Sequence, residues 1–301
     1  MYPGKLALVA LLCVGVCLHA GVMRASSQQV AVVPQSSTIS PQALAPLAGQ
    51  IADNAGKIGC QAGKCKILIT SFVFPGSGTS QFGIQLADAL AAQLSQGEKG
   101  FEVVDRAAAR KFAQQERVSA QNQASELMAR WIARELKADA VLTGEITIAG
   151  SNSIELSARL FQVEGHKNKA LGLKGTLHID LSHADLSPID DFPTLPGFND
   201  GLNSQSVYRR SGITLPHCFY MPSPPYTEQA RAQHISGTIL VDAIIDTHGN
   251  LPQAQIVKGL SGGLDENALK TLSTWRCEAP KVNGQPVPTV VRFEVNFRLF
   301  N

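Results

Sequence analysis

The stretch TVVRFEVNFRL, residues 289–299, alternates apolar and polar side chains more cleanly than any other part of the chain. From residue 291 its apolar positions share one face, and Arg292, Glu294, Asn296 and Arg298 share the other. A period of two residues indicates a β-strand with one face against a hydrophobic core. We therefore predict a sheet whose last strand has a buried face and a polar face.

Residues 224–258 extend this prediction backwards along the chain. Pro224 and Pro225 precede a short helix at 226–233, since proline is tolerated at a helix start and blocks extension backwards. Gly237 opens a β-branched run at 238–245 that has apolar residues on both faces, which predicts a strand covered on both sides. The turn residues at 247–250 then predict a reversal into a second strand at 251–258.

A second helix is predicted between this hairpin and the last strand. Asp265 and Glu266 stand in its first turn, where the helix dipole favours negative charge. Apolar residues from Leu264 to Trp275 form one stripe, and Asn283-Gly284 is a turn signal. The predicted order is helix–strand–strand–helix–strand.

This order resembles the C-terminal domain of the TonB family of periplasmic energy-coupling proteins. The residues that carry the resemblance are Pro224, Tyr226, Ala230, Arg231, Gly237, Gly249, Leu264, Asp265, Trp275, Gly284 and Pro286. The chain departs from the family pattern at Thr227, where a second proline is common, and at Cys277, where an aromatic residue is usual.

The resemblance implies a protein-binding module rather than an enzyme. In that family the last strand is an exposed sheet edge that accepts an extended segment of an outer-membrane receptor, a mode called strand addition. The implied partner-binding residues are Thr289, Val290, Arg292, Glu294, Asn296 and Arg298. The alternative is an ordinary solvated face whose charges protect the edge from aggregation.

Four cysteines lie beyond residue 25, and four cysteines allow three pairings. The short spacing favours a local Cys60–Cys65 bridge. Cys218 and Cys277 flank the C-terminal domain of about 85 residues, and a bridge closing a ~60-residue loop contributes roughly 4 kcal/mol in the chain-entropy model. Two unpaired buried thiols are the alternative. A zinc site lacks both the paired C-x₂-C spacing and a nearby histidine cluster.

The first 25 residues have the layout of a secretory signal peptide, with one early lysine, an apolar run and small residues near the end. Residues 6–23 can alternatively remain in the membrane as an uncleaved anchor, which would permit an inner-membrane complex. Either outcome places the body of the protein in the periplasm. The net charge of +2 and the 17 % charged residues do not indicate a nucleic-acid partner.

The middle of the chain predicts an α/β unit. We expect strands at 66–74, 101–104, 138–144, 154–163 and 170–181, the last two joined by a polar turn at 165–168. Helices are expected at 81–94, from Arg106 with Asp105 as its cap, and through 127–136. The phrases FEVVDR (101–106) and ADAVLTG (138–144) resemble an α/β domain of envelope proteins of the TolB N-terminal, FlgO and CsgG type. That resemblance implies a scaffold or interaction role.

Catalytic patterns are weak in this sequence. The segment GCQAGKC at 59–65 departs from a phosphate loop in spacing and precedes its strand, and PGSGTS at 75–80 lacks a terminal lysine. No nucleophile-elbow pattern is present. We therefore predict no enzyme activity, no cofactor and no metal.

The predicted fold class is α+β or α/β: a mixed-sheet α/β domain followed by a small α-β-β-α-β domain. The predicted divisions are a leader or anchor (1–25), a linker (26–59) with a weak helix at 41–53, an α/β domain (60–182), a second linker (183–215) and the TonB-like domain (216–301). The predicted function is TonB-like coupling through strand addition in support of outer-membrane transport. The alternative is an envelope scaffold without energy transduction.

Overall fold

The computed structural model describes residues 39–61, 63–96, 101–164, 170–189, 214 and 216–299, which belong to one compact unit. The predicted leader, the turn at 165–168 and most of the second linker lie outside these residues. We call residues 39–189 the middle domain and residues 216–299 the C-terminal domain. Within the described residues, no helix has the length and apolar character that a membrane crossing needs.

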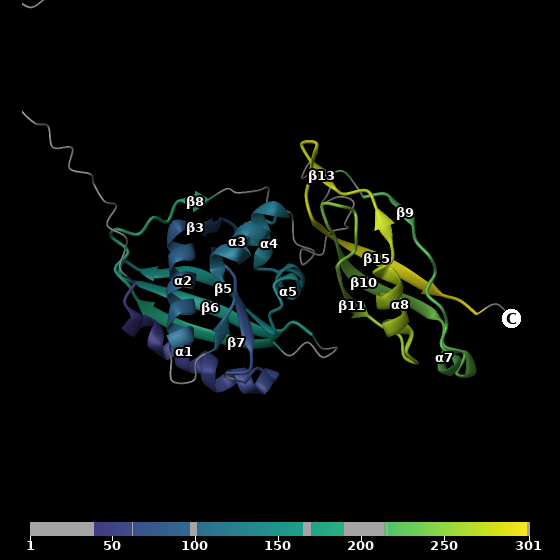
Figure 1. Cartoon of the computed structure of the whole chain (residues 1–301), viewed down its shortest axis with the longest axis horizontal. Helices are drawn as coiled ribbons and strands as arrows, with labels where there is room; N and C mark the ends of the chain where they lie inside the picture. Colours follow the sequence, from purple (N-terminus) through teal and green to yellow (C-terminus); the bar gives the residue numbers. More distant parts are fainter. Residues whose placement is uncertain are drawn as a thin grey trace, which may run out of the picture. The chain divides into compact units, whose positions relative to one another are not determined.

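The middle domain is a mixed sheet with helices on both faces (Figure 1). Its elements are α1 (Pro41–Ala55), the 3₁₀ turn η1 (Gly56–Ile58), β1 (Lys66–Ile69), β2 (Val73–Phe74), β3 (Gly78–Ser80), α2 (Gln81–Gln96), β4 (Glu102–Val103), α3 (Arg106–Gln115), α4 (Ala120–Gln123), α5 (Glu126–Glu135), β5 (Ala140–Gly150), β6 (Ser153–Gln162), β7 (Ala170–His178) and β8 (Pro188–Ile189). The strands run in the order β4-β1-β5-β2-β3-β8; off this path, β6 pairs with β5, and β7 pairs with β6.

Successive residues of β1 enter two different cores. Ile67 and Ile69 pack with α1 and α2, whereas Leu68 packs with residues of α3 and α5 such as Trp131. A strand buried on both faces is an almost continuous apolar run, which explains the sequence KILI of β1. The α/β part of the predicted fold class is confirmed.

Two predictions for the middle domain need correction. The single strand expected at 66–74 is divided into β1 and β2, because the chain leaves the ladder at 70–72 and the Phe72 ring packs on Gly144. A Cβ on Gly144 would lie 2.6 Å from that ring, so only glycine fits there. Residues 41–55, placed in a linker with a weak helix, form α1, whose buried Leu44, Leu47 and Ile51 belong to the core.

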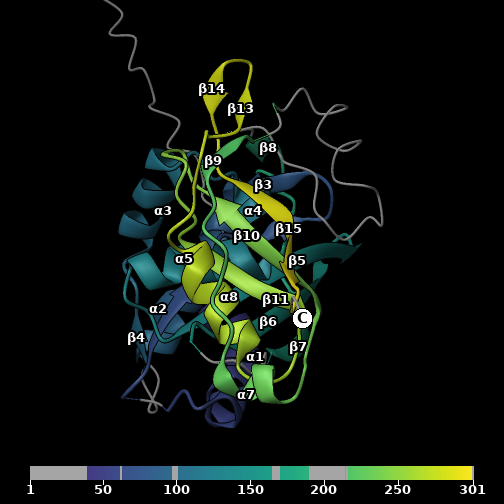
Figure 2. The same cartoon turned by 90° about the vertical axis from the view of Figure 1, so that its right-hand side faces the viewer.

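The C-terminal domain follows the predicted order, with four additional short strands. Its elements are β9 (Cys218–Tyr220), α7 (Glu228–Ala232), β10 (Gly237–Ile245), β11 (Gln253–Lys258), α8 (Leu264–Leu272), β12 (Arg276–Cys277), β13 (Lys281–Val282), β14 (Gln285–Pro286) and β15 (Thr289–Phe297). Figure 2 shows α8 lying across the sheet of β10, β11 and β15, and the β13–β14 hairpin projecting from it.

Both faces of β10 are buried, as the sequence predicts. Ile239, Val241 and Ala243 lie in the core that contains α8. On the other face, Ile244 is fully buried and belongs to a cluster that includes Trp131 of α5. The C-terminal sheet is therefore covered on one face by its own helix and, around Ile244, on the other face by α5.

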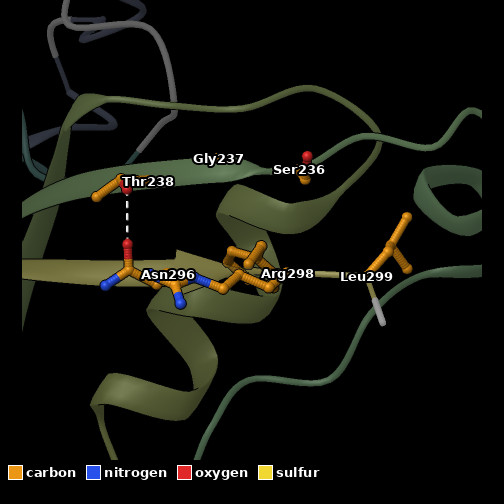
Figure 3. A pocket seen from close by; sticks show the side chains of 7 residues that line it. Ser236, Gly237, Thr238, Asn296, Arg298 and Leu299 are labelled. Atoms are coloured by element: carbon orange, nitrogen blue, oxygen red, sulfur yellow. Dashed lines mark hydrogen bonds between the residues drawn. The ribbon is translucent and has the colours of Figure 1, made fainter. Parts of the chain in front are cut away.

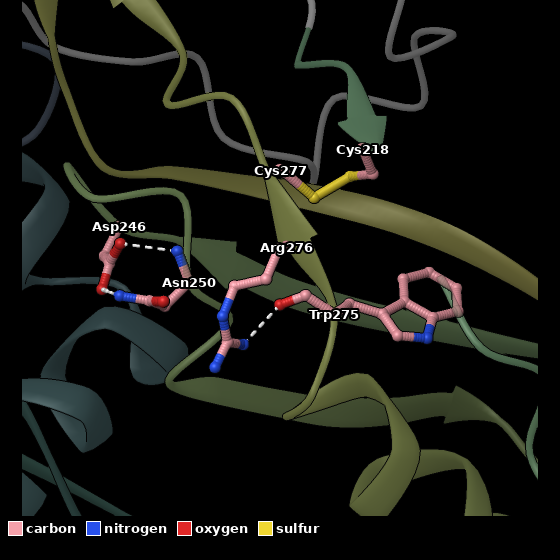
Figure 4. Close-up of a disulfide and its surroundings, with 6 residues drawn as sticks. All are labelled: Cys218, Asp246, Asn250, Trp275, Arg276 and Cys277. Atoms are coloured by element: carbon pink, nitrogen blue, oxygen red, sulfur yellow. Dashed lines mark hydrogen bonds between the residues drawn. A yellow bond between two sulfur atoms is a disulfide. The ribbon is translucent and has the colours of Figure 1, made fainter. Parts of the chain in front are cut away.

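Both predicted disulfides are formed. Cys60 and Cys65 close a short loop next to the middle-domain core, and both are buried. Cys218 and Cys277 join β9 to β12, the antiparallel pair that the sequence analysis did not anticipate (Figure 4). The second bridge thus fixes the segment before α7 to the segment after α8.

Candidate partner-binding edge

The last strand, β15, forms one side of the three-stranded sheet β11-β10-β15. It pairs antiparallel with β10 along its whole length, from Gly237 opposite Phe297 to Ile245 opposite Thr289. Among the strands that the structure describes, β10 is its only hydrogen-bonded neighbour. The strand at the other edge of this sheet, β11, packs against α5 and α8.

The apolar face of β15 is anchored in the core. Val291, Val295 and Phe297 are buried there. Edge-to-face ring contacts hold Phe293 against Trp275, with centroids 5.3 Å apart, and Phe297 against Tyr226, with centroids 5.4 Å apart. These contacts fix the position of the strand in the core, and therefore also the position of its polar face.

The polar face of β15 begins with an ion pair. The Arg292 guanidinium donates to both carboxylate oxygens of Asp242, at 2.7 and 2.9 Å. Hydrogen bonding to Asp242 raises the pKa of Arg292, against a smaller opposing effect of burial. Because Asp242 is only 7 % exposed, Arg292 stabilises a nearly buried carboxylate in addition to lining the edge.

The remaining polar residues follow at intervals of two. Glu294 is exposed and lies opposite Leu240. The Asn296 amide oxygen accepts a hydrogen bond of 2.6 Å from the Thr238 hydroxyl. Arg298 is exposed and lies beyond the last residue that pairs with β10. Thr289 is buried and Val290 is half-buried, so the outward polar part of the strand is its C-terminal half.

A hollow of ≈ 410 Å³ lies where β10 begins and β15 ends. Figure 3 shows Ser236, Gly237 and Thr238 on one side of it and Asn296, Arg298 and Leu299 on the other. The hollow therefore combines a cation, two hydroxyl groups and an amide with the apolar side chain of Leu299. Such a surface can accept a polar or acidic side chain.

Several residues that carry the TonB resemblance have clear structural roles. Ala230 and Leu264 are fully buried in the C-terminal core. The Asp265 carboxylate accepts a hydrogen bond from the Leu260 amide, and the Trp275 indole donates to the Pro222 carbonyl oxygen at 3.0 Å. These residues hold α8 and the chain entry in place.

The two turn glycines have positive φ angles. Gly249 has φ 81°, and a Cβ there would lie 1.9 Å from the Cys277 carbonyl oxygen. Asp246 stabilises this turn by accepting from the amides of His248 and Asn250 and from the Asn250 side chain (Figure 4). Gly284 has φ 78° and follows Asn283 in the β13–β14 turn, as the sequence predicts.

The remaining residues of that set lie at the ends of elements. Tyr226 donates its hydroxyl to the Ile235 carbonyl oxygen at 3.2 Å, which closes the loop around α7. Pro224 is half-buried before this helix, and Arg231 is exposed in its last turn. Gly237 is the first residue of β10, and Pro286 is the last of β14.

In the middle domain, Asp105 was expected to cap the helix that begins at Arg106. The Asp105 carboxylate does cap α3, since it accepts from the Ala107 amide at 2.9 Å. Arg106, however, is buried and pairs with Asp88 at 2.7 Å, while it also donates to the Ile69 carbonyl oxygen. Burial lowers the pKa of Arg106, and Asp88 opposes that effect. The Arg106 side chain therefore turns inward toward β1.

The glycine-rich turn at 75–80 is built into the sheet. Residues 78–80 form β3, which pairs with β2 and β8. The Ser80 hydroxyl accepts a hydrogen bond from the Gly83 amide at 3.1 Å, so the first turn of α2 is capped from within the chain. Across the described parts of the chain, no group of three His, Cys, Asp or Glu side chains is arranged to hold a metal ion.

The residues that face the polar part of β15 from the neighbouring segment could not be identified from the sequence. Asp242 and Thr238 of β10 are brought beside Arg292 and Asn296 by the register of the ladder, and Ser236, which precedes β10, lines the hollow. Asp242 was the one residue whose pairing the sequence could have indicated, because a carboxylate inside the apolar run at 238–245 requires a charged or hydrogen-bonding partner.

Family comparisons agree with this architecture. The model of the Gram-negative bacterial TonB protein C-terminal family matches residues 222–299, and the FlgO protein family model matches residues 45–167. The chain joins a FlgO-type domain to a TonB-type C-terminal domain. Both resemblances inferred from the sequence are thereby confirmed. A comparison with curated proteins gives no match.

Solved structures with similarity to the chain include two relevant examples. Escherichia coli LpoB, an NMR structure, is 18 % identical, with 60 % of this chain and 87 % of that chain covered and a TM-score of 0.39. The C-terminal domain of Pseudomonas aeruginosa TonB is 24 % identical, with 30 % and 90 % covered and a TM-score of 0.25.

The TonB-type match and the two disulfides point to an exported protein of the cell envelope that takes part in protein interaction.

Proposed function

We propose that this protein is a non-enzymatic, periplasmic envelope protein that binds an extended segment of a partner by adding it as a new strand along β15. The partner is an outer-membrane receptor or another envelope protein, and binding supports transport across the outer membrane. The binding residues are 293–299, which comprise the C-terminal half of β15 and the two residues that follow it. Thr289, Val290 and Arg292 contribute by holding the strand to its neighbours.

The position of β15 carries this proposal. Among the described strands it lies at the edge of its sheet, with its apolar face fixed in the core by Trp275 and Tyr226 and its polar face exposed from Arg292 onward. A strand in an antiparallel ladder turns alternate backbone N–H and C=O groups away from its neighbour. An added segment satisfies those groups, which provides affinity, while alternate side chains provide selectivity.

The TonB-type family match over residues 222–299 supports coupling as the purpose of this binding. The FlgO-type match over residues 45–167 covers a longer part of the chain and favours a second candidate, an assembly scaffold in the envelope. The fate of the leader separates the two candidates. Force transmission from the inner membrane requires a retained anchor, and a cleaved protein cannot transmit it. The mass of the mature N-terminus, measured on protein from the native envelope, decides this point.

Hydrogen–deuterium exchange tests strand addition directly. The full chain is measured alone and with synthetic peptides that correspond to the N-terminal segments of outer-membrane receptors from the same organism. We expect slower exchange of the amides at 293–299, because an added strand accepts hydrogen bonds from the outer side of β15. Peptides with prolines at alternate positions serve as the control, since proline cannot donate to the ladder.

Unchanged exchange at 293–299 on a folded chain would contradict strand addition. Slower exchange confined to β9, the exposed strand that contains Phe219 and Tyr220, would place peptide binding elsewhere on the C-terminal domain.

A further inference from the structure

The outward side chains of β15, and that of Arg298 just after it, differ in whether they have a hydrogen-bond or ion-pair partner within the protein. Arg292 is matched by Asp242, and Asn296 is hydrogen-bonded to Thr238. Glu294 lies opposite the apolar side chain of Leu240. Arg298 lies past the final pair of the ladder. Within the described part of the chain, neither the Glu294 nor the Arg298 side chain makes a hydrogen bond or an ion pair.

We propose that the segment added to β15 carries an acidic side chain opposite Arg298 and a basic side chain opposite Glu294, four residues apart. This inference rests on the proposed function and specifies its partner. Side chains opposite each other on neighbouring strands have Cβ atoms about 5 Å apart, within reach of an ion pair. The two charges on β15 are separated by four residues, or about 13 Å, and the added strand has the same spacing.

The hollow at the end of β15 supports the acidic position. The Asn296 amide oxygen already accepts from Thr238, so its NH₂ group is left to donate to a ligand. Ser236 adds an exposed hydroxyl group, and Arg298 adds a planar guanidinium that binds carboxylates with paired hydrogen bonds. All three groups line the same ≈ 410 Å³ hollow (Figure 3). A carboxylate matches this set of donors, whereas a second cation would be repelled by Arg298.

The direction of the added strand determines the order of its charges. An antiparallel segment presents the acidic residue first and the basic residue four positions later. A parallel segment presents them in the reverse order. In either case the partner is an extended peptide with one residue of each sign, four positions apart.

The expected selectivity is moderate. Each opposite-charge cross-strand pair changes affinity by roughly 1.4- to 5-fold, and like charges placed opposite each other weaken binding similarly. Exchanging the two charges of the peptide converts two attractive pairs into two repulsive ones. The four increments multiply, so we expect the dissociation constant of the exchanged peptide to be larger by roughly 4- to 600-fold.

Peptide selection on the full chain tests the proposal with no assumption about the sequence of the partner. A random library of eleven-residue peptides is selected on the wild-type chain and on the Glu294→Lys/Arg298→Glu variant. We expect the wild-type chain to enrich peptides with an acid and a base four positions apart in one order. The variant then enriches the opposite order, whichever direction the strand adopts.

The controls separate charge pairing from other effects. Lys281→Glu reverses an exposed charge on the β13–β14 hairpin and leaves the selected order unchanged. Arg298→Gln removes the positive charge at an exposed position, so the variant loses the preference for an acid opposite residue 298 and keeps the preference for a base opposite Glu294. Tryptophan fluorescence of each variant reports folding, and the affinity of synthetic selected peptides is measured by fluorescence anisotropy.

The two proposals fail in different ways. Selected peptides that slow hydrogen exchange at 293–299 but carry no charge pair, or the same order on both chains, would overturn the charge rule and leave strand addition intact. Selection that yields no peptide, or peptides that protect only β9, would overturn strand addition and the charge rule together.

Discussion

Each of the two domains contains one disulfide and an ion pair between arginine and aspartate, but the disulfides close loops of different length and the pairs differ in which member is buried. In the middle domain the disulfide spans five positions; the Arg106 side chain is buried and also bonded to the backbone of β1, while Asp88 is partly exposed and binds Arg110 as well. In the C-terminal domain the disulfide spans 59 positions; Asp242 is the buried member of the pair and Arg292 is partly exposed at the sheet edge. The middle domain thus encloses an arginine, whereas the C-terminal domain has the longer covalent loop and keeps its arginine at the surface.

Among these substitutions, Cys277→Ser is expected to lower the free energy of unfolding of the C-terminal domain the most. In the chain-entropy model, opening a ~60-residue loop costs roughly 4 kcal/mol of unfolding free energy. The chain has two tryptophans, Trp131 and Trp275, one in each domain, so urea unfolding in a Trp131→Phe background reports the C-terminal domain alone. An unchanged midpoint in oxidising buffer would show that the bridge contributes nothing.

Arg106→Ala is expected to cause the second-largest loss in the free energy of unfolding. The substitution removes one of the two arginine partners of Asp88 and the Arg106 donor to the buried Ile69 carbonyl oxygen, at a cost of up to about 3 kcal/mol. Unfolding is followed by Trp131 fluorescence in a Trp275→Phe background. Arg110→Ala is the matched control, because Arg110 binds the same aspartate from a more exposed position and should cost far less. Equal losses for the two variants would contradict an internal role for Arg106.

Cys60→Ser measures how much the shorter disulfide stabilises the middle domain. A loop of about six residues is worth roughly 2 kcal/mol by the same loop model, half of the value for the longer bridge. The middle-domain transition, again monitored through Trp131, gives the measured value. A loss as large as that of Cys277→Ser would mean that packing of the buried sulfur atoms, rather than loop closure, dominates.

Arg292→Ala has the smallest expected effect on stability, about 1 kcal/mol, because its guanidinium is partly exposed and water can reach Asp242 once it is removed. Arg298→Ala, which breaks no ion pair of the described residues, is the matched control with no loss. Arg292→Glu places a second carboxylate against Asp242 and is expected to destabilise the domain more than Arg292→Ala does. Equal stability of the Arg292→Ala and Arg298→Ala proteins would show that the Arg292–Asp242 ion pair does not stabilise the fold.

The sequence predicted the features of this protein that depend on local pattern. Alternation in residues 289–299, the turn at Gly249 and the stripe that begins at Leu264 all follow from spacing, and each is confirmed in the structure. The helix at 41–55 was underestimated, because its alanines and prolines obscure an apolar stripe that is evident only once α2 and β7 pack against it.

The candidate site was predicted only in part, because its composition depends on register. Sequence alternation places Arg292, Glu294, Asn296 and Arg298 on one face and assigns them equal roles. The ladder shows that two of them are already satisfied by Asp242 and Thr238, residues about 50 positions or more away. Long-range pairings of this kind leave little trace in a single sequence, as the inward turn of Arg106 also shows.

The most direct test of strand addition is an NMR measurement on the isotope-labelled, oxidised full chain with a bound receptor peptide. Contacts between the peptide backbone and the backbone of β15, observed as nuclear Overhauser effects, define the neighbour of the strand. The account predicts contacts at alternate residues from 293 to 299, with a basic peptide side chain beside Glu294 and an acidic one beside Arg298. A bound peptide whose contacts lie on β9 or the middle domain, with none on β15, would contradict it.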